Sequence, residues 1–421
     1  MHITILTYGS RGDVQPFLAL AIGLQKAGHH PRLAAPARFK AFVEGYGIPF
    51  INLAGDPGII SQRLNEAGAN PIRMVRAISD YIFSISGQVL EQALNACQDT
   101  ELIVHSFLFT TGGHSLARKL GIPDLSVQTF PVFAPTRALP PVYAPGLKAG
   151  FLRKVFHQLT TQLFWHGGNL GFRKMQKEHP QKYDLELRWP FLNRAQETPT
   201  PLVFAFSPRV VPRPEEWNPS QIHIPGYFFL DALETYHPSD DLVTFLRKGS
   251  PPVCITFGSM INREAARIYR TVLKAVQATH TRAIILSGWG PLDQLSSSQD
   301  IFITESVPHD WLLPQCKAVI HHGGAGTTAA GLRAGIPNLV VPFAADQPFW
   351  GTRVHELGCG PRPIPVKKLT EAQLVFALRE AERLSICTRA SKISQKIREE
   401  EGIGRTIKLI ETFPFRKQRP A

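Results

Sequence analysis

Residues 321–328 read His-His-Gly-Gly-Ala-Gly-Thr-Thr and follow the apolar run Ala318-Val319-Ile320. An apolar run, a glycine-rich turn and then a helical pattern are typical of a βα unit. Glycines let backbone N–H groups approach an anion without a Cβ in the way, and the N-terminus of the helix adds partial positive charge. A histidine at the strand end can add a hydrogen bond. This stretch therefore predicts a phosphate-binding turn rather than an ordinary glycine-rich one.

The next apolar run, Asn338 to Val341, leads through Pro342 to Asp346 and Gln347. These two residues are expected at the carboxyl end of a strand beside the phosphate-binding turn. A carboxylate that accepts hydrogen bonds and an amide that both accepts and donates would suit the neighbouring hydroxyls of a sugar. An ordinary turn with Asp346 as a helix N-cap is an equal alternative.

A second glycine-bearing turn follows the first apolar strand, Ile3 to Thr7, and contains Gly9, Ser10, Gly12 and Asp13. The glycines would let this turn come close to bound substrates. Asp13 falls at or near the start of a helix, where carboxylates often act as caps. It could also act as a general base that removes the proton of an attacking hydroxyl, an effect typically worth about 10²–10⁴-fold in rate.

The rhythm of strand, turn and helix recurs in both halves of the chain. Short apolar runs lie at 3–7, 32–35 and 102–104 in the first half and at 253–257, 283–286, 318–320 and 338–341 in the second half. This pattern predicts an α/β protein made of two doubly wound, Rossmann-like domains. The join is expected between Gly226 and Gly249, and the cleft between the domains is the expected ligand site.

The stretch from Pro131 to Pro145 contains five prolines in fifteen residues, which excludes a helix or a central strand and predicts a loop over the cleft. A helical pattern follows. Its apolar stripe of Phe151, Val155, Leu159 and Leu163 is expected to pack on the core of the domain. An apolar wall for a substrate, or a face for a membrane surface, is the alternative.

The 421 residues are 43% hydrophobic and 19% charged, which is a globular composition. The N-terminus lacks a basic region and a long apolar region, so no signal peptide is expected. Five scattered cysteines without metal-ligand spacing indicate reduced thiols in a cytoplasmic protein and predict no metal site.

The formal net charge of +13 would suit nucleic acid, an anionic membrane or a polyanionic small ligand, or would simply maintain solubility. Nucleic acid is not expected as a partner, because the chain has no repeated basic-aromatic pattern and no zinc or helix-turn-helix signature. A peripheral contact with an anionic membrane remains open.

Taken together, six motifs resemble the family 1 glycosyltransferases of the GT-B fold, in the branch of the sterol 3-β-glucosyltransferases and the antibiotic glycosyltransferases. The resemblance covers nearly the whole chain. Its motifs are GSRGDVQP (Gly9 to Pro16), GYFFLD (Gly226 to Asp231), ITFGSM (Ile255 to Met260), VPHDWL (Val307 to Leu312), HHGGAGTTAAGLRAGIP (His321 to Pro337) and PFAADQP (Pro342 to Pro348).

The resemblance implies a nucleotide-sugar donor in the C-terminal domain. The residues that it assigns to the donor are Ser259, Val307, His321, Gly323, Gly324, Gly326, Thr327, Asp346 and Gln347. Among them, His321 and the amides of Gly326 and Thr327 would bind the diphosphate, assisted by Ser259. The backbone of Val307 would meet the base, and Asp346 and Gln347 would hold the sugar.

For the other substrate, the resemblance implies Asp13 as the general base and inversion by direct displacement, without a metal or a further cofactor. The acceptor side would comprise Gly9, Ser10, Gly12 and His114. The donor would be UDP-glucose or a dTDP-sugar. The acceptor would be a small apolar molecule with a hydroxyl, such as a sterol, terpenoid, carotenoid or polyketide.

The resemblance also predicts three regions. The acceptor-binding domain would span residues 1–228 and the donor-binding domain residues 229–390, with a helical segment over 391–421 that crosses back to the first domain. Ser306 and Ala329 depart from the plant branch, where a tryptophan and a glutamate stand, and fit the sterol and antibiotic branches better.

Two other classes of protein fit the sequence less well. A Rossmann oxidoreductase is disfavoured because the first glycine turn lacks the full G-x-G-x-x-G spacing and has no clearly placed acidic residue for a ribose. A non-catalytic module that binds a nucleotide sugar or a lipid would be expected to lack the base, yet Asp13 is present.

Overall fold

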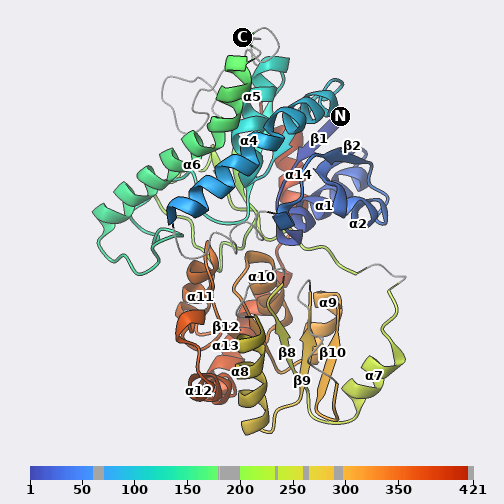
Figure 1. Cartoon of the computed structure of the whole chain (residues 1–421), viewed down its shortest axis with the longest axis vertical. Coiled ribbons are helices and arrows are strands. Elements are labelled where there is room, and N and C mark those ends of the chain that lie inside the picture. The colour runs from blue at the N-terminus through green and yellow to red at the C-terminus, as the bar shows by residue number, and fades with distance from the viewer. Residues whose placement is uncertain are drawn as a thin grey trace.

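The computed structural model describes residues 1–59, 71–178, 180, 200–232, 236–258, 265–288 and 297–415, and it has two α/β domains (Figure 1). The N-terminal domain forms the upper lobe of the figure and the C-terminal domain the lower lobe, each built around a parallel sheet. The expectation of two doubly wound, Rossmann-like domains is confirmed.

The sheet of the N-terminal domain has the order β3-β2-β1-β4-β5-β6-β7 in the described part of the chain, and all neighbours are parallel. Both faces of its central strands are buried, which explains why β4 reads as a nearly continuous apolar run. The strands are β1 (His2–Leu6), β2 (His30–Pro36), β3 (Phe50–Leu53), β4 (Leu102–His105), β5 (Asp124–Gln128), β6 (Leu202–Phe204) and β7 (Ile222–His223).

Helices cover both faces of this sheet. The long helices α4 and α6 pack on each other, and α6 also contacts α5. The helical elements here are α1 (Arg11–Lys26), η1 (Ala37–Phe39), α2 (Lys40–Glu44), α4 (Pro71–Ala96), η2 (Phe107–Phe109), α5 (Thr110–Leu120) and α6 (Gly150–Glu178).

The C-terminal domain has a parallel sheet with the order β10-β9-β8-β11-β12 among the residues that the structure describes. Its strands are β8 (Val253–Thr256), β9 (Ala283–Leu286), β10 (Ile301–Thr304), β11 (Ala318–His321) and β12 (Asn338–Val340). Its helical elements are α7 (Asp240–Arg247), α8 (Ala265–Ala278), α9 (His309–Leu312), η3 (Leu313–Gln315), α10 (Ala325–Ala334), α11 (Gln347–Glu356), η4 (Val366–Lys368), α12 (Glu371–Ala381) and α13 (Leu384–Arg398).

The chain passes between the domains twice. It leaves the first sheet after β7 and enters the second at β8, and the boundary expected at 228/229 lies in this crossing. The last helix, α14 (Gly402–Thr412), returns to pack on α1, where Ile407 and Ile410 join the core of the N-terminal domain.

The two crossings touch at a pair of glycines. A Cβ added to Gly402 would overlap the carbonyl oxygen of Tyr227, and one added to Gly226 would lie 3.2 Å from the Cα of Gly402. Gly226 also has a φ of 128°, which side chains rarely adopt. The close approach of the two backbones therefore depends on glycine at both positions.

Among the described residues, no helix is both long enough and apolar enough to cross a bilayer.

Candidate active site

The two turns predicted from the sequence belong to different domains and face each other. The turn after β1 lies at the start of α1, and α1 contacts α10, the helix that follows the glycine-rich turn. The charge of Asp13 raises the pKa of Asp346, and the charge of Arg11 contributes to lowering the pKa of His309. The carboxyl ends of both sheets thus line one site between the domains, as expected for doubly wound folds.

Asp13 is both a helix cap and a candidate base. Its Oδ2 accepts hydrogen bonds from the backbone N–H of Ser10, at 2.7 Å, and from the Ser10 hydroxyl, at 2.9 Å. This is one half of a capping box at the start of α1. Its Oδ1 accepts no hydrogen bond from the described residues, so one oxygen is anchored and the other is available. Burial raises the pKa of Asp13 although the hydrogen bonds from Ser10 oppose the effect.

The glycines of this turn differ in their importance. Gly9 has a φ of 134°, and a Cβ added there would overlap the carboxylate of Asp13. Gly12 is less constrained, because a Cβ added there would lie 3.6 Å from the Ser10 hydroxyl oxygen. Gly9 is therefore required for the position of Asp13.

His321 does not have the geometry expected of a phosphate ligand. Its ring is fully buried at the end of β11. The Gly323 N–H donates to its Nδ1 at 3.1 Å, and its Nε2 lies 3.1 Å from Oδ1 of Asn338, to which it donates. Burial lowers the pKa of His321 to about 3. Both nitrogens therefore have a partner within the fold.

The neighbouring His322 has the free nitrogen. Its Nδ1 is buried and has no hydrogen-bond partner among the described residues. The ring lies beside the glycine turn, because a Cβ on Gly324 would be 2.5 Å from its Nε2 and one on Gly258 would be 3.2 Å from its Cε1. Burial lowers the pKa of His322 to about 4, although a hydrogen bond of the ring with the Thr256 backbone opposes the effect. His322 has no expected role from its sequence motif alone. Successive residues at a strand end point to opposite sides, so the two adjacent rings have different surroundings.

The glycine turn leaves the start of α10 open. Gly323 has a φ of 92°, and a Cβ there would be 2.7 Å from Cγ1 of Val340, so a larger residue does not fit. Gly324 is the N-cap of α10, and no atom lies within 4 Å of a Cβ placed on Gly326. The amides of Gly326 and Thr327 lie in the first turn of α10, where N–H groups have no partner within the helix. These features suit an anion.

The loop after β12 presents Asp346. The indole Nε1–H of Trp350 donates to Oδ2 of Asp346 at 2.9 Å, and burial raises the pKa of Asp346 to about 6. Oε1 of Gln347 accepts hydrogen bonds from the backbone N–H groups of Phe343, at 2.8 Å, and Ala344, at 3.2 Å. Asp346 is the N-cap of α11 by position, but its carboxylate makes no side-chain cap bond. Gln347 thus shapes the loop, and Asp346 is the group that carries charge.

Aromatic side chains form a wall beside this loop. Phe107 lies 5.1 Å from Phe164 on α6, and Phe164 lies 5.2 Å from Tyr143, measured between ring centroids. Burial raises the pKa of Tyr143, and the charge of Asp346 adds to this effect. The proline-rich segment and α6 therefore approach the site together.

Three expected residues remain: Ser259, Val307 and His114. Ser259 is outside the described residues, and the side chain of Val307 is buried in the core. His114 is buried in α5, inside the N-terminal domain. Its Nδ1 lies 3.0 Å from Oδ2 of Asp124, and Nε2 of His105 lies 2.9 Å from the same oxygen. In the described part of the chain, His114 forms hydrogen bonds with Asp124 and Thr200 and none with the turn after β1.

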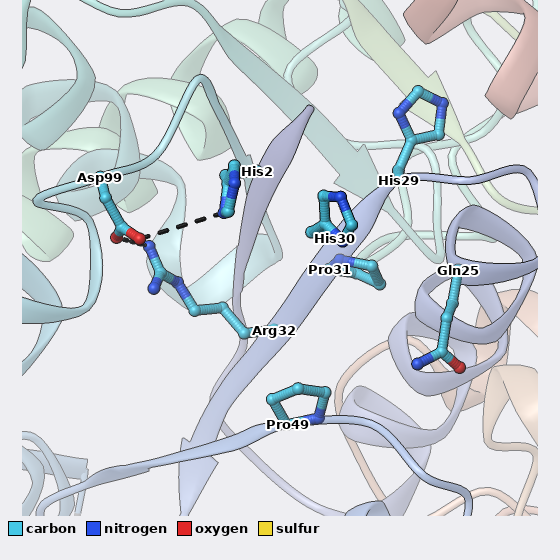
Figure 2. Close-up of a pocket in the computed structure, with 8 residues that line it drawn as sticks. All are labelled: His2, Gln25, His29, His30, Pro31, Arg32, Pro49 and Asp99. Carbon is cyan, nitrogen blue, oxygen red and sulfur yellow. Dashed lines mark hydrogen bonds and ion pairs between the residues drawn. The ribbon is translucent and has the colours of Figure 1, made fainter.

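A separate pocket of about 350 Å³ lies at the opposite end of the first sheet (Figure 2). Figure 2 shows the imidazole rings of His2, His29 and His30 around it, at the amino ends of β1 and β2. The pocket also contains the ion pair between Arg32 and Asp99. Because the site between the domains lies at the carboxyl ends of the strands, this pocket is not part of it.

In the described ranges, no group of three or more His, Cys, Asp or Glu side chains is arranged to hold a metal ion.

The fold and the motifs agree with known glycosyltransferases. The glycosyltransferase family 28 N-terminal domain matches residues 3–139, and the C-terminal domain of the erythromycin biosynthesis protein CIII-like family matches residues 273–401. The crystal structure of the glycosyltransferase of kitacinnamycin has a TM-score of 0.70 at 20% identity and covers 98% of this chain and 99% of its own. The calicheamicin glycosyltransferase CalG4 has a TM-score of 0.68 at 17% identity, with 98% of each chain covered. The fold is therefore GT-B.

Curated relatives define the family more closely. Two sterol 3-beta-glucosyltransferases of Arabidopsis thaliana are 36% and 34% identical, over 99% and 97% of this chain and 66% and 67% of their own lengths. A sterol 3-beta-glucosyltransferase of Candida albicans is 34% identical over 96% of this chain but only 27% of its own length. The chain thus spans about two thirds or less of these relatives. It belongs to the family 1 glycosyltransferases.

Proposed function

We propose that this protein transfers glucose from UDP-glucose to the 3-hydroxyl of a sterol, with inversion at the anomeric carbon. The observation that carries the proposal is a pair of carboxylates across the cleft. Asp13 is anchored through one oxygen, and its charge adds to the effect of burial in raising the pKa of Asp346. The names of the relatives support the donor sugar and the sterol. A dTDP-sugar donor and another apolar alcohol are the alternatives.

In the proposed reaction, the sterol hydroxyl attacks the anomeric carbon from the side of Asp13. The new bond from the hydroxyl oxygen to that carbon forms as the bond to the diphosphate oxygen breaks. The hydroxyl proton passes to Oδ1 of Asp13, the oxygen that Ser10 does not hold. The bond pair leaves with UDP, and water later removes the proton from Asp13.

The leaving diphosphate would be held by the start of α10 and by His322. The amides of Gly326 and Thr327 point out of the first helical turn, and the helix dipole adds positive charge there. His322 contributes the nitrogen that has no partner in the fold, and we assign to it the role that the sequence analysis gave to His321. We propose that the reaction needs no metal, since these groups offset the charge that develops on the leaving group.

The sugar and the acceptor would meet different parts of the site. The Asp346 carboxylate can accept hydrogen bonds from sugar hydroxyls, and the aromatic wall of Phe107, Tyr143 and Phe164 offers an apolar surface to a sterol. Gln347 uses its amide oxygen within the loop, so its contribution is to position Asp346.

The experiment is to incubate the purified protein with UDP-glucose and detergent-dispersed sterol and to measure steryl glucoside and UDP. Equal amounts of both products, with the β configuration at the new bond and the same rate in a metal chelator, are expected. Hydrolysis of UDP-glucose without steryl glucoside would contradict the acceptor, and loss of turnover in the chelator would contradict the metal-free reaction. dTDP-glucose and other apolar alcohols are tested in parallel.

A further inference from the structure

Three of the four residues of the stripe expected on α6, Phe151, Leu159 and Leu163, face solvent, and Val155 is partly buried. The packing of this stripe on the core that the sequence predicted is therefore wrong for these three. The exposed fractions are 68% for Phe151, 50% for Leu152, 64% for Leu159, 68% for Leu163 and 47% for Leu170. We call these five residues the α6 ridge. The spacing of its leucines places them on one side of the helix. Such a solvent-exposed apolar row on one element indicates an interaction surface.

The opposite side of α6 is the one that packs on the domain. His157, Thr161 and Trp165 are buried there at intervals of one helical turn, and Asn169 continues the row. This side meets α4 and α5. In Figure 1, α6 follows the left outline of the upper lobe, with these two helices on its inner side. The helix therefore turns its more polar side inward and its apolar side outward.

The segment of the chain that contains the ridge carries positively charged side chains and no acidic ones. From Leu125 to Lys177 the sequence contains no Asp or Glu, whereas the chain average of 33 acids in 421 residues predicts about four in a stretch of this length. The same stretch contains seven cations: Arg137, Lys148, Arg153, Lys154, Arg173, Lys174 and Lys177.

Few of these cations are neutralised. Lys154 lies 4.0 Å from Glu216, and Lys174 lies 3.8 Å from Glu178. Arg173 and Lys177, in the last turns of α6, form no ion pair with any residue that the structure describes. An apolar row flanked by unpaired cations matches the two layers of an anionic bilayer surface, in which acyl chains lie beneath negative headgroups.

We propose that the α6 ridge docks on an anionic lipid bilayer. A second copy of this chain would suit the surface less well, because it would carry the same net charge of +13 and the same basic stretch. The ridge belongs to the helix whose Phe164 contacts Tyr143 and Phe107 in the aromatic wall. Docking would therefore place the acceptor side of the cleft next to the membrane, and this last point alone rests on the proposed acceptor.

The test is co-sedimentation of the full chain with vesicles of phosphatidylcholine, alone or mixed with phosphatidylserine. We expect binding to the mixed vesicles that falls as the salt concentration rises. The double variant Leu159→Gln/Leu163→Gln should lower vesicle affinity about tenfold or more, because two apolar side chains no longer enter the bilayer. Both leucines are largely exposed, so the variant should fold.

Matched control variants distinguish binding through the α6 ridge from non-specific adsorption to vesicles. Phe376→Gln/Leu384→Gln removes two side chains of the C-terminal domain that are 62% and 81% exposed, and should leave binding unchanged. Arg173→Gln/Lys177→Gln should weaken binding and reduce its salt dependence, whereas Lys367→Gln/Lys368→Gln on η4 should have a smaller effect.

Three results would overturn the proposal. The first is no binding of the wild type to the mixed vesicles, and the second is equal binding of the Leu159→Gln/Leu163→Gln variant. The third is a dimeric wild type that this variant converts into a monomer while vesicle binding stays intact. Turnover of detergent-dispersed sterol by the same variants is measured alongside. Binding that depends on the ridge without any glucosyl transfer would refute the proposed function alone, and normal transfer without vesicle binding would refute the docking surface alone.

Discussion

A Cβ on Gly9 would overlap Oδ2 of Asp13. The carboxylate of Asp13 therefore occupies space that any side chain at residue 9 would fill. Ser10 then fixes that oxygen with two hydrogen bonds. The turn after β1 therefore positions Asp13 through the backbone as well as through the capping box.

Gly9→Ala is expected to lower kcat about 100-fold, because the carboxylate must move out of line with the acceptor hydroxyl. UDP binding, measured by calorimetry, should stay within about twofold because Gly9 is in the other domain. Gly12→Ala is the matched control, since its Cβ has room, and it should retain most activity. Equal losses in the two variants would contradict the positioning role.

Asp13→Asn should lower kcat about 10²–10⁴-fold while the affinity for UDP-glucose is retained. A general base acts when ionised, and burial raises the pKa of Asp13. The wild-type rate is therefore expected to fall as pH falls through that raised pKa. The pH–rate profile of both proteins checks this, and near-normal turnover by a folded Asp13→Asn variant would rule out the base.

The two adjacent histidines should respond differently to substitution. His322→Ala should weaken UDP binding about tenfold, by loss of one hydrogen bond to a charged group, with little change in stability. His321→Ala should instead reduce the free energy of unfolding by about 1–3 kcal/mol, because the Gly323 N–H and Asn338 Oδ1 lose their partner. Calorimetry and urea unfolding distinguish the two. The reverse outcome would restore His321 as the phosphate ligand.

The raised pKa of Asp346 predicts that the affinity for UDP-glucose depends on pH. Its pKa of about 6 means that the carboxylate loses its charge as pH falls through this value, and with it the stronger hydrogen bonds to sugar hydroxyls. UDP-glucose affinity should therefore fall as pH falls, with a midpoint near pH 6. UDP is not a suitable comparison, because its terminal phosphate itself titrates at about pH 6.

Asp346→Asn is the control for that measurement, because an amide does not titrate. Its affinity for UDP-glucose should be lower than that of the wild type and flat across pH 6. The same midpoint in the Asp346→Asn variant would show that a different group titrates.

The sequence predicted the two sheets and both glycine turns because apolar runs and glycines report local backbone structure directly. It could not show which nitrogens of His321 and His322 are paired within the fold, since the side on which a strand-end residue points depends on the register of β11 with its neighbours. The α6 ridge was also misassigned. Periodicity shows that a helix has an apolar side, but not that His157, Thr161 and Trp165 provide the buried one.

The contact between Gly226 and Gly402 has a mechanical consequence. Because the two crossings touch at these glycines, a side chain at either position would push the crossings apart. Such a change would shift the turn that carries Asp13 relative to the loop that carries Asp346 and would leave both sheets intact. The same pair of glycines thus helps to set the spacing between the two carboxylates.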